Sequence, residues 1–121
     1  MQYALLIYQD ESESAAPDSE DAQRIYGEYF AFTEKITNDG VYLGGEALVG
    51  VDSATTVRVR SGEVLTTDGP FAETKEQLGG FYLVEAADLD EAIRIAAELP
   101  GSWYGSVEVR PVWDWESDAT G

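Results

Sequence analysis

The fold of this chain is decided by the stretch Thr67-Asp68-Gly69-Pro70-Phe71-Ala72-Glu73-Thr74-Lys75-Glu76, followed by Gly79-Gly80 and the apolar run Phe81 to Val84. Its Gly-Pro pair joins a residue with a permissive backbone to one with a fixed φ angle, which predicts a rigid turn. The mixed charges after the turn predict a solvated connection. The apolar run then predicts a buried strand that this turn and connection lead into.

Further strands lie on both sides of this stretch. The hydrophobic pattern predicts them at residues 2–9, 41–49, 55–60, 79–85 and 106–112, with a short extended piece at 63–66. The first strand is apolar on both faces, which is typical of a central, buried strand. Gly44-Gly45 interrupts the second strand and indicates a bulge or a close backbone approach.

Two helices separate the strands. Asp18 or Ser19 can cap the first helix, and Asn38-Asp39-Gly40 is a stop signal for it. Asp88 caps the second helix, and Pro100-Gly101 ends it. Apolar residues at helical spacing predict the buried faces. These are Ala22, Ile25, Tyr26, Tyr29, Phe30, Thr33 and Ile36 in the first helix, and Leu89, Ala92, Ile93 and Ala96 in the second.

The order of these elements predicts an α+β fold of the ferredoxin-like, split β-α-β kind, an antiparallel sheet with two helices on one face. The length of 121 residues allows one domain, over residues 1–115, followed by an acidic C-terminal tail over residues 116–121. Because two helices can cover only one side of a sheet that is apolar on both, the sequence predicts a homodimer, sheet against sheet.

The charge of the chain limits its partners. There are 24 acidic residues against 7 basic ones, a formal net charge of -17. Such a field repels phosphate backbones and anionic lipid, so neither nucleic acid nor membrane is an expected partner. The acids are spread along the chain, which favours an adaptation to a salt-rich cytoplasm, as in a halophile. An acidic surface for a basic partner and an ordinary acidic bacterial protein are the alternatives.

Several kinds of chemistry lack their residues in this sequence. The chain has no cysteine, so disulfides, thiol nucleophiles and thiolate metal sites are excluded. No ladder of Asp and Asn has the spacing of a metal loop, and we expect neither a dedicated metal site nor a cofactor. The start of the chain has no basic leader and no long apolar segment, so we expect a cytoplasmic protein.

A set of short motifs covers nearly the whole chain. The motifs are Tyr3 to Tyr8, Gly44-Gly45-Glu46-Ala47-Leu48, Ala54-Thr55-Thr56-Val57-Arg58, Thr67 to Glu76, Gly79-Gly80-Phe81-Tyr82, Asp88 to Ala92, and Gly105 to Pro111. Taken together, they resemble the YCII-related family, and most closely its DGPF-domain branch. The resemblance implies a dimeric α+β barrel with a pocket between helices and sheet or near the dimer seam. It brings no well-established reaction with it.

The chain departs from the wider family in one respect. YCII-like members have been proposed to use a histidine–aspartate pair, and this sequence contains no histidine. That acid/base route is therefore closed here. A Ser-His-Asp hydrolase triad is excluded for the same reason.

Asp68 is the candidate catalytic residue, as a pocket carboxylate that acts as a base or anchors a ligand; the alternative is a turn-forming aspartate. Arg110 lies on the charged face of the last strand, and it either binds an anionic ligand or pairs with Glu108, Glu46 or Asp68. The remaining ligand-binding candidates are Arg58, Glu46, Lys75 and Tyr82. Lys75 can neutralise a ligand carboxylate or form an ordinary surface ion pair.

Three hypotheses of function follow. The first is a small-molecule pocket walled by Asp68 and Arg110. If the pocket belongs to an enzyme, the carboxylate is the base and an arginine stabilises developing negative charge. The second is a non-catalytic binding or regulatory module, since some DGPF-type proteins are associated with extracytoplasmic-function sigma factors. In the third, the polar cluster is purely structural and lies at the dimer interface.

Overall fold

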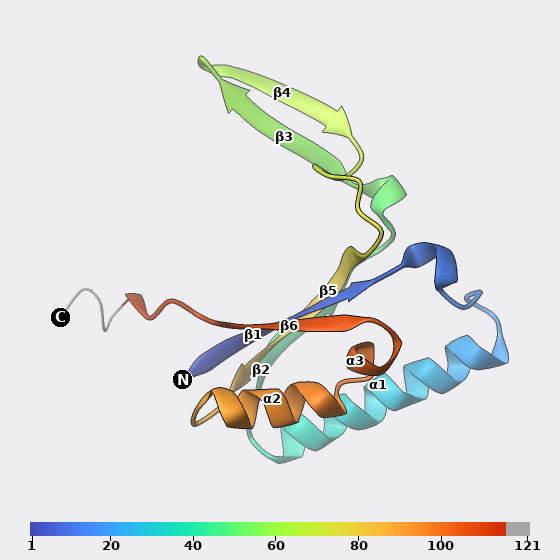
Figure 1. Cartoon of the computed structure of the whole chain (residues 1–121), viewed down its shortest axis with the longest axis vertical. Helices are drawn as coiled ribbons and strands as arrows, with labels where there is room; N and C mark the ends of the chain where they lie inside the picture. Colours follow the sequence, from blue (N-terminus) through green and yellow to red (C-terminus); the bar gives the residue numbers. More distant parts are fainter. Residues whose placement is uncertain (116–121) are drawn as a thin grey trace.

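The structure is a computed structural model that describes residues 1–115. In this part of the chain, a four-stranded antiparallel sheet in the order β2-β5-β1-β6 has its helices on one face (Figure 1). The strands of this sheet are β1 (Gln2–Gln9), β2 (Tyr42–Ala47), β5 (Gln77–Glu85) and β6 (Ser106–Pro111). The predicted ferredoxin-like arrangement is confirmed. The tail predicted over residues 116–121 lies outside the described residues.

Strand β1 is the centre of the sheet, as its apolar sequence predicts. It pairs with β5 on one side and β6 on the other. Tyr3, Leu5 and Ile7 point to the helices and are buried. The alternate residues Ala4, Leu6 and Tyr8 point to the opposite face, where they are only half-buried. The helix side of β1 is therefore the core of the molecule.

Helix α1 (Glu20–Asn38) has the boundaries that its capping signals predict. The Ser19 hydroxyl accepts a hydrogen bond from the backbone N–H of Ala22 at 3.1 Å and so caps the first turn. The helix ends just before Gly40, whose φ of +76° places it in the left-handed region.

The predicted buried face of α1 is wrong at two positions. Tyr26 and Phe30 are 57% and 72% exposed, whereas Phe32 and Ile36 are buried in the core. The sequence offers two neighbouring apolar stripes on one helix, and the sheet has room to cover only one of them. Helical spacing alone does not decide which stripe turns inward.

Helix α2 (Leu89–Glu98) begins at Asp88, whose carboxylate accepts a hydrogen bond from the Glu91 N–H at 2.9 Å. Ala92 and Ala96 are buried as predicted. The prediction was wrong for Leu89 and Ile93, which are exposed, and Leu99 is buried in their place. The chain continues as a short helix, α3 (Gly101–Tyr104), at the point where Pro100-Gly101 was expected only to end α2.

Gly44-Gly45 produces the irregularity that the sequence indicates. The register of β2 against β5 shifts between Tyr42 and Gly44, which is the signature of a bulge in an edge strand. After the shift, Gly45 lies opposite Tyr82 on the helix side of the sheet, and Glu46 lies opposite Phe81 on the other side.

Two further strands, β3 (Thr55–Arg60) and β4 (Glu63–Asp68), form a separate two-stranded sheet that we call the arm. The short piece predicted at 63–66 is thus a full strand that reaches Asp68. Figure 1 shows the arm standing clear of the body, on the side of the four-stranded sheet away from the helices. At its base, the Gly69 N–H donates to the Ala54 carbonyl at 2.7 Å and closes the loop.

The face of the four-stranded sheet away from the helices is the open face. Its middle carries half-buried apolar side chains, which are Ala4, Leu6, Phe81 and Leu83. In residues 1–115, neither α1 nor α2 covers this side (Figure 1).

Candidate functional site

A cleft of about 820 Å³ lies between α1 and the helix side of the sheet. Its inner lining combines glycine backbone, three tyrosines and a threonine, namely Tyr29, Thr33, Tyr42, Gly45, Gly80 and Tyr82. This cleft is the candidate functional site. The sequence indicates a pocket in this region only through the family resemblance.

The floor of the cleft is glycine backbone. Gly45 and Gly80 occupy positions whose side chains would point at the helices. A Cβ at Gly45 would lie 2.6 Å from the Phe81 carbonyl oxygen, and one at Gly80 would lie 2.8 Å from the Glu46 carbonyl oxygen. Glycine is required by the close approach of the two strands, and the missing side chains leave space under α1.

Tyr82 is held in place by a hydrogen bond and by two aromatic contacts. Its hydroxyl lies 2.7 Å from Thr33 Oγ1, which is itself 2.9 Å from the Tyr29 carbonyl oxygen. Because a carbonyl can only accept, the threonine hydroxyl donates to it and the Tyr82 hydroxyl donates to the threonine. The Tyr82 ring meets Phe32 edge-on, with centroids 5.2 Å apart, and Tyr42 at 6.0 Å.

The hydroxyls of Tyr29 and Tyr82 stay protonated at neutral pH. Burial raises the pKa of Tyr29 to about 12. Burial also raises the pKa of Tyr82. These groups therefore serve as hydrogen-bond donors and acceptors and not as phenolate bases.

Charged side chains occur at the solvent end of the lining. Arg24 Nη1 lies 2.9 Å from Asp21 Oδ1, and both side chains are more than half exposed. The Tyr104 hydroxyl donates to Glu28 Oε1 at 2.6 Å, which links α3 to α1 beside the cleft. The hydrogen bond to Glu28 is the main reason why the pKa of Tyr104 is raised. Among the described residues, no charged side chain is buried in the core.

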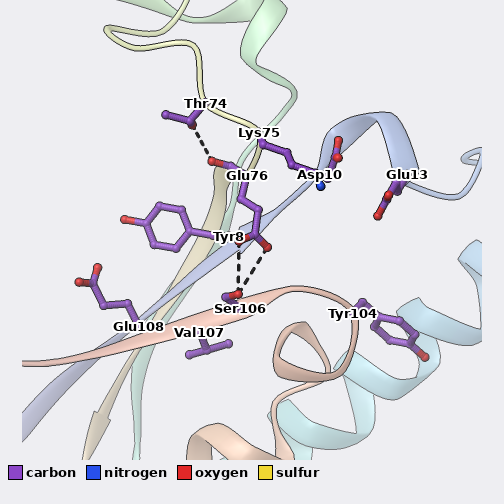
Figure 2. Close-up of a pocket in the computed structure, with 10 residues that line it drawn as sticks. All are labelled: Tyr8, Asp10, Glu13, Thr74, Lys75, Glu76, Tyr104, Ser106, Val107 and Glu108. Atoms are coloured by element: carbon purple, nitrogen blue, oxygen red, sulfur yellow. Dashed lines mark hydrogen bonds between the residues drawn. The ribbon is translucent and has the colours of Figure 1, made fainter.

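A second hollow, of about 680 Å³, is more polar and lies partly on the open face. Figure 2 shows Tyr8, Ser106 and Glu108 along its base with Lys75 and Glu76 above them. Ser106 Oγ lies 3.4 Å from both carboxylate oxygens of Glu76. Four of the ten lining side chains are carboxylates and one is a lysine, so the hollow repels anions.

The six residues proposed from the sequence are divided among several places. Tyr82 lines the cleft, and Glu46 lines it from the edge strand β2, although the register directs its side chain to the open face. Lys75 lines the second hollow. Asp68 and Arg58 lie exposed on the arm, outside both hollows. A single copy of the chain therefore does not bring the six together.

Arg110 is exposed on the open face, opposite Ala4. Within residues 1–115 it forms no ion pair with Glu108, Glu46 or Asp68, which is the structural alternative that the sequence left open. For Asp68 and Glu46 the reason is geometric. Asp68 belongs to a separate sheet, and β2 and β6 are opposite edges of the four-stranded sheet.

The residues that sequence reasoning missed are Tyr29, Thr33, Gly45 and Gly80 as parts of one site. The signals were present, because Thr33 and Tyr29 fall on the helix face toward the sheet and both glycine pairs lie within strands. Nothing in their spacing places the two glycine strands side by side. That information comes from the register of β2 against β5.

Two absences apply to the described part of the chain. Residues 1–115 contain no group of three or more acidic side chains placed to hold a metal ion. No helix among them combines the length and the apolar character needed to cross a bilayer.

The chain belongs to the YCII-related family. The model of the YCII-related domain matches residues 1–116, and the fold and capping described above agree with the motifs that carry the resemblance. A relative in Rhizobium meliloti (strain 1021), an uncharacterized protein, is 43% identical over 114 residues, which are 93% of this chain and 92% of the relative.

A solved structure shares the fold. It is 5-chloro-2-hydroxyhydroquinone dehydrochlorinase from Burkholderia phenoliruptrix AC1100 in complex with 2,5-dihydroxybenzoquinone. The TM-score is 0.54 at 15% sequence identity, with 97% of this chain and 98% of that chain covered. At this identity the likeness concerns the fold.

Proposed function

We propose that this protein binds a small, flat, uncharged molecule in the cleft between α1 and the sheet. The observation that carries the proposal is the hollow of about 820 Å³ with a bare glycine floor and a pair of linked hydroxyls above it. A volume of this size is typical of small-molecule sites. A floor without side chains favours a planar ligand, because backbone and ring can then lie in contact.

The chemistry of the lining sets the character of the ligand. Tyr29, Tyr82 and Thr33 offer neutral hydroxyls. The protons of Tyr82 and Thr33 are already donated within the chain, so these two accept from a ring hydroxyl, whereas the Tyr29 hydroxyl can donate to a ring carbonyl. An unpaired ionic group would lose its hydration there without a buried partner of opposite charge. The structural neighbour is solved in complex with a dihydroxybenzoquinone, a planar ring that carries such groups. Because its enolic hydroxyls ionise at neutral pH, the uncharged hydroquinone is the first probe for this chain.

The arrangement of side chains in a single chain favours ligand binding over catalysis. The carboxylates that line the cleft, which are Asp10, Glu13, Asp21 and Glu46, do not lie in its buried interior. None of them sits beside the hydroxyl pair in a hydrogen bond among the described residues. If the protein is an enzyme, Asp68 remains the proposed base, and it must reach the ligand from another copy or after a movement of the arm.

A homodimer is the second part of the proposal. The open face exposes a contiguous apolar centre that includes Leu6, Phe81 and Leu83. An uncovered face of this kind is costly in water and is normally covered by a partner. A second copy placed sheet against sheet by a two-fold axis covers both open faces at once.

Titration calorimetry with hydroquinone tests the binding site, and 2,5-dihydroxybenzoquinone is the ionised comparison, which should bind more weakly. We expect one site per chain, at least tenfold weaker in Tyr82→Phe and in Thr33→Val. The matched control is Tyr8→Phe, which removes a tyrosine hydroxyl on the opposite side of the same sheet. Equal affinity in all four proteins would place the ligand elsewhere, and no binding of either probe would remove planar phenols and quinones from the proposal.

A further inference from the structure

The arm is an exposed piece of secondary structure. Eleven of its twelve strand residues are exposed, and only Thr56 is half-buried. In Figure 1 it stands clear of the body that the rest of the chain forms. A two-stranded hairpin is marginally stable on its own in water, so a hairpin of this length needs a surface to pack against.

The two faces of the arm differ in character. Residues paired across antiparallel strands share a face, and the register pairs Val59 with Val64 and Val57 with Thr66. This valine face is 57–65% exposed at its three valines. The opposite face is more polar, because the register places Arg58 beside Leu65 and Arg60 beside Glu63 there. An arm with one apolar face is expected to pack that face against another surface.

The arm and the open face border the same space. The arm rises on the side of the sheet away from the helices, and this is the side that the open face looks toward (Figure 1). One chain thus presents two uncovered apolar surfaces to one region of solvent. The arm of the chain does not cover its own open face. A single partner can therefore contact both the valine face and the open face.

Charge favours a second copy of this chain as that occupant. The arginines Arg58 and Arg60 balance Glu63 and Asp68, so the arm is neutral and the whole net charge of -17 lies on the rest of the chain. A neutral or locally basic segment can approach an equally acidic body, whereas two acidic bodies repel each other. The arm is therefore the part of the chain best suited to contact another copy.

We infer that the arm is a clasp that packs its valine face against the body of a second copy, beside the open face on which that copy sits. This inference rests on the proposed homodimer and adds the element that holds it together. With two-fold symmetry each copy clasps the other, and both arms gain a surface.

The clasp also predicts where the Asp68 carboxylate lies in the dimer. Asp68 pairs with Thr55 at the base of the arm, two residues along from Thr66, and therefore lies on the valine face. Docking carries this carboxylate to the seam between the copies. A site built around Asp68 at this seam is shared by two chains, and it is separate from the cleft, which lies on the helix side of the sheet.

Sedimentation equilibrium on paired variants tests the clasp. Val64→Asp with Thr66→Asp puts two charges on the valine face of β4, and Leu65→Asp with Thr67→Asp puts the same two charges on the opposite face of the same strand. We expect the first pair to weaken dimerisation at least tenfold more than the second. Equal weakening, or none, would overturn the inference.

The charged variants could weaken dimerisation simply by unfolding the arm. A deletion of the arm provides an independent test. Ala54 and Gly69 are hydrogen-bonded at the base, so residues 55–68 can be replaced by two glycines without separating the ends. The circular dichroism spectrum should keep its helical signal, and dimerisation should weaken at least tenfold. A folded variant without the arm that pairs as tightly as the full chain would refute the clasp and leave the sheet-to-sheet dimer standing. A full chain that stays monomeric at all concentrations would refute both, while ligand binding in the cleft is tested separately.

Discussion

The hydroxyls of Tyr82 and Thr33 form a polar contact between a helix and a strand. It joins residues 49 positions apart in the sequence and holds helix α1 to strand β5 at one point. The contact is only partly buried, so water can replace part of what is lost when one partner is removed. Its contribution should therefore be that of an ordinary hydrogen bond.

Removing the Tyr82 hydroxyl measures that contribution. Tyr82→Phe keeps the ring contacts with Phe32 and Tyr42 and removes the donor to Thr33. We expect the free energy of unfolding to fall by about 0.5–1.5 kcal/mol in urea denaturation. In the double variant with Thr33→Val the losses should not add, because both changes remove the same bond. Full additivity would mean that the two hydroxyls act separately.

Glycine positions allow a second prediction at the residue scale. Gly45→Ala places a methyl group 2.6 Å from a backbone carbonyl oxygen, which no side-chain movement can relieve. We expect a loss of about 1–3 kcal/mol in thermal unfolding. The control is Gly27→Ala in the middle of α1, where no atom lies within 4 Å of the added methyl group. That change should stabilise the protein by about 0.5–1 kcal/mol, since alanine favours helix.

At the scale of elements, the sequence predicts the order, type and capping of most secondary structure. Ser19, Gly40 and Asp88 act on the chain near them, and each has the predicted role. Local chemistry also places the β2 bulge at its glycine pair. These features are readable because their causes lie within a few residues of their effects.

Packing between elements was less predictable for a physical reason. The choice between the Phe32 stripe and the Tyr26–Phe30 stripe on α1 depends on which one the sheet can reach. The same applies to Leu99, which is buried where Ile93 was expected. The cleft itself arises from the meeting of two glycine strands under one helix, so only its members Tyr82 and Glu46 were foreseen.

The contact of α1 with the sheet gives a prediction on pH. Because burial raises the pKa of Tyr29 from its ordinary 10 to about 12, the folded protein holds this proton more tightly than the unfolded chain does. The stability that this provides is complete below pH 10 and is lost as the pH rises toward 12. We expect the melting temperature to fall across this range, with Tyr82 acting in the same direction.

A pair of variants isolates the effect of Tyr29. Tyr29→Phe should flatten the decline between pH 10 and 12, because the titrating group is gone. Tyr26→Phe removes an exposed tyrosine from the same helix and should leave the decline unchanged. An equal slope in both variants would assign the alkaline instability to other groups.

For the whole molecule, charge is the dominant property. The acids are spread over strands, loops and helices, and the five ion pairs found within residues 1–115 are all at the surface. Such pairs contribute little, so they do not offset the self-repulsion of a net charge of -17. Salt screens this repulsion over distances beyond about 10 Å at 0.1 M.

Stability should therefore rise steeply with KCl if the acidity is an adaptation to salt. We expect the melting temperature to increase by at least about 5 °C between low and molar KCl at pH 7. The same titration close to the isoelectric point of about 4.1 is the control, because the net charge is then small and its screening should matter little. A melting temperature that does not change with KCl at pH 7 would remove the salt adaptation.

The open face has a thermodynamic consequence beyond its shape. If one face of the sheet is covered only when two copies associate, folding is coupled to association. The stability of the protein then depends on its concentration. Each tenfold dilution then lowers the stability of the assembled protein by about 1.4 kcal/mol per mole of dimer. Melting curves at 1 and 100 micromolar protein should be displaced from each other, and a cell that makes few copies would hold a smaller folded fraction than one that makes many.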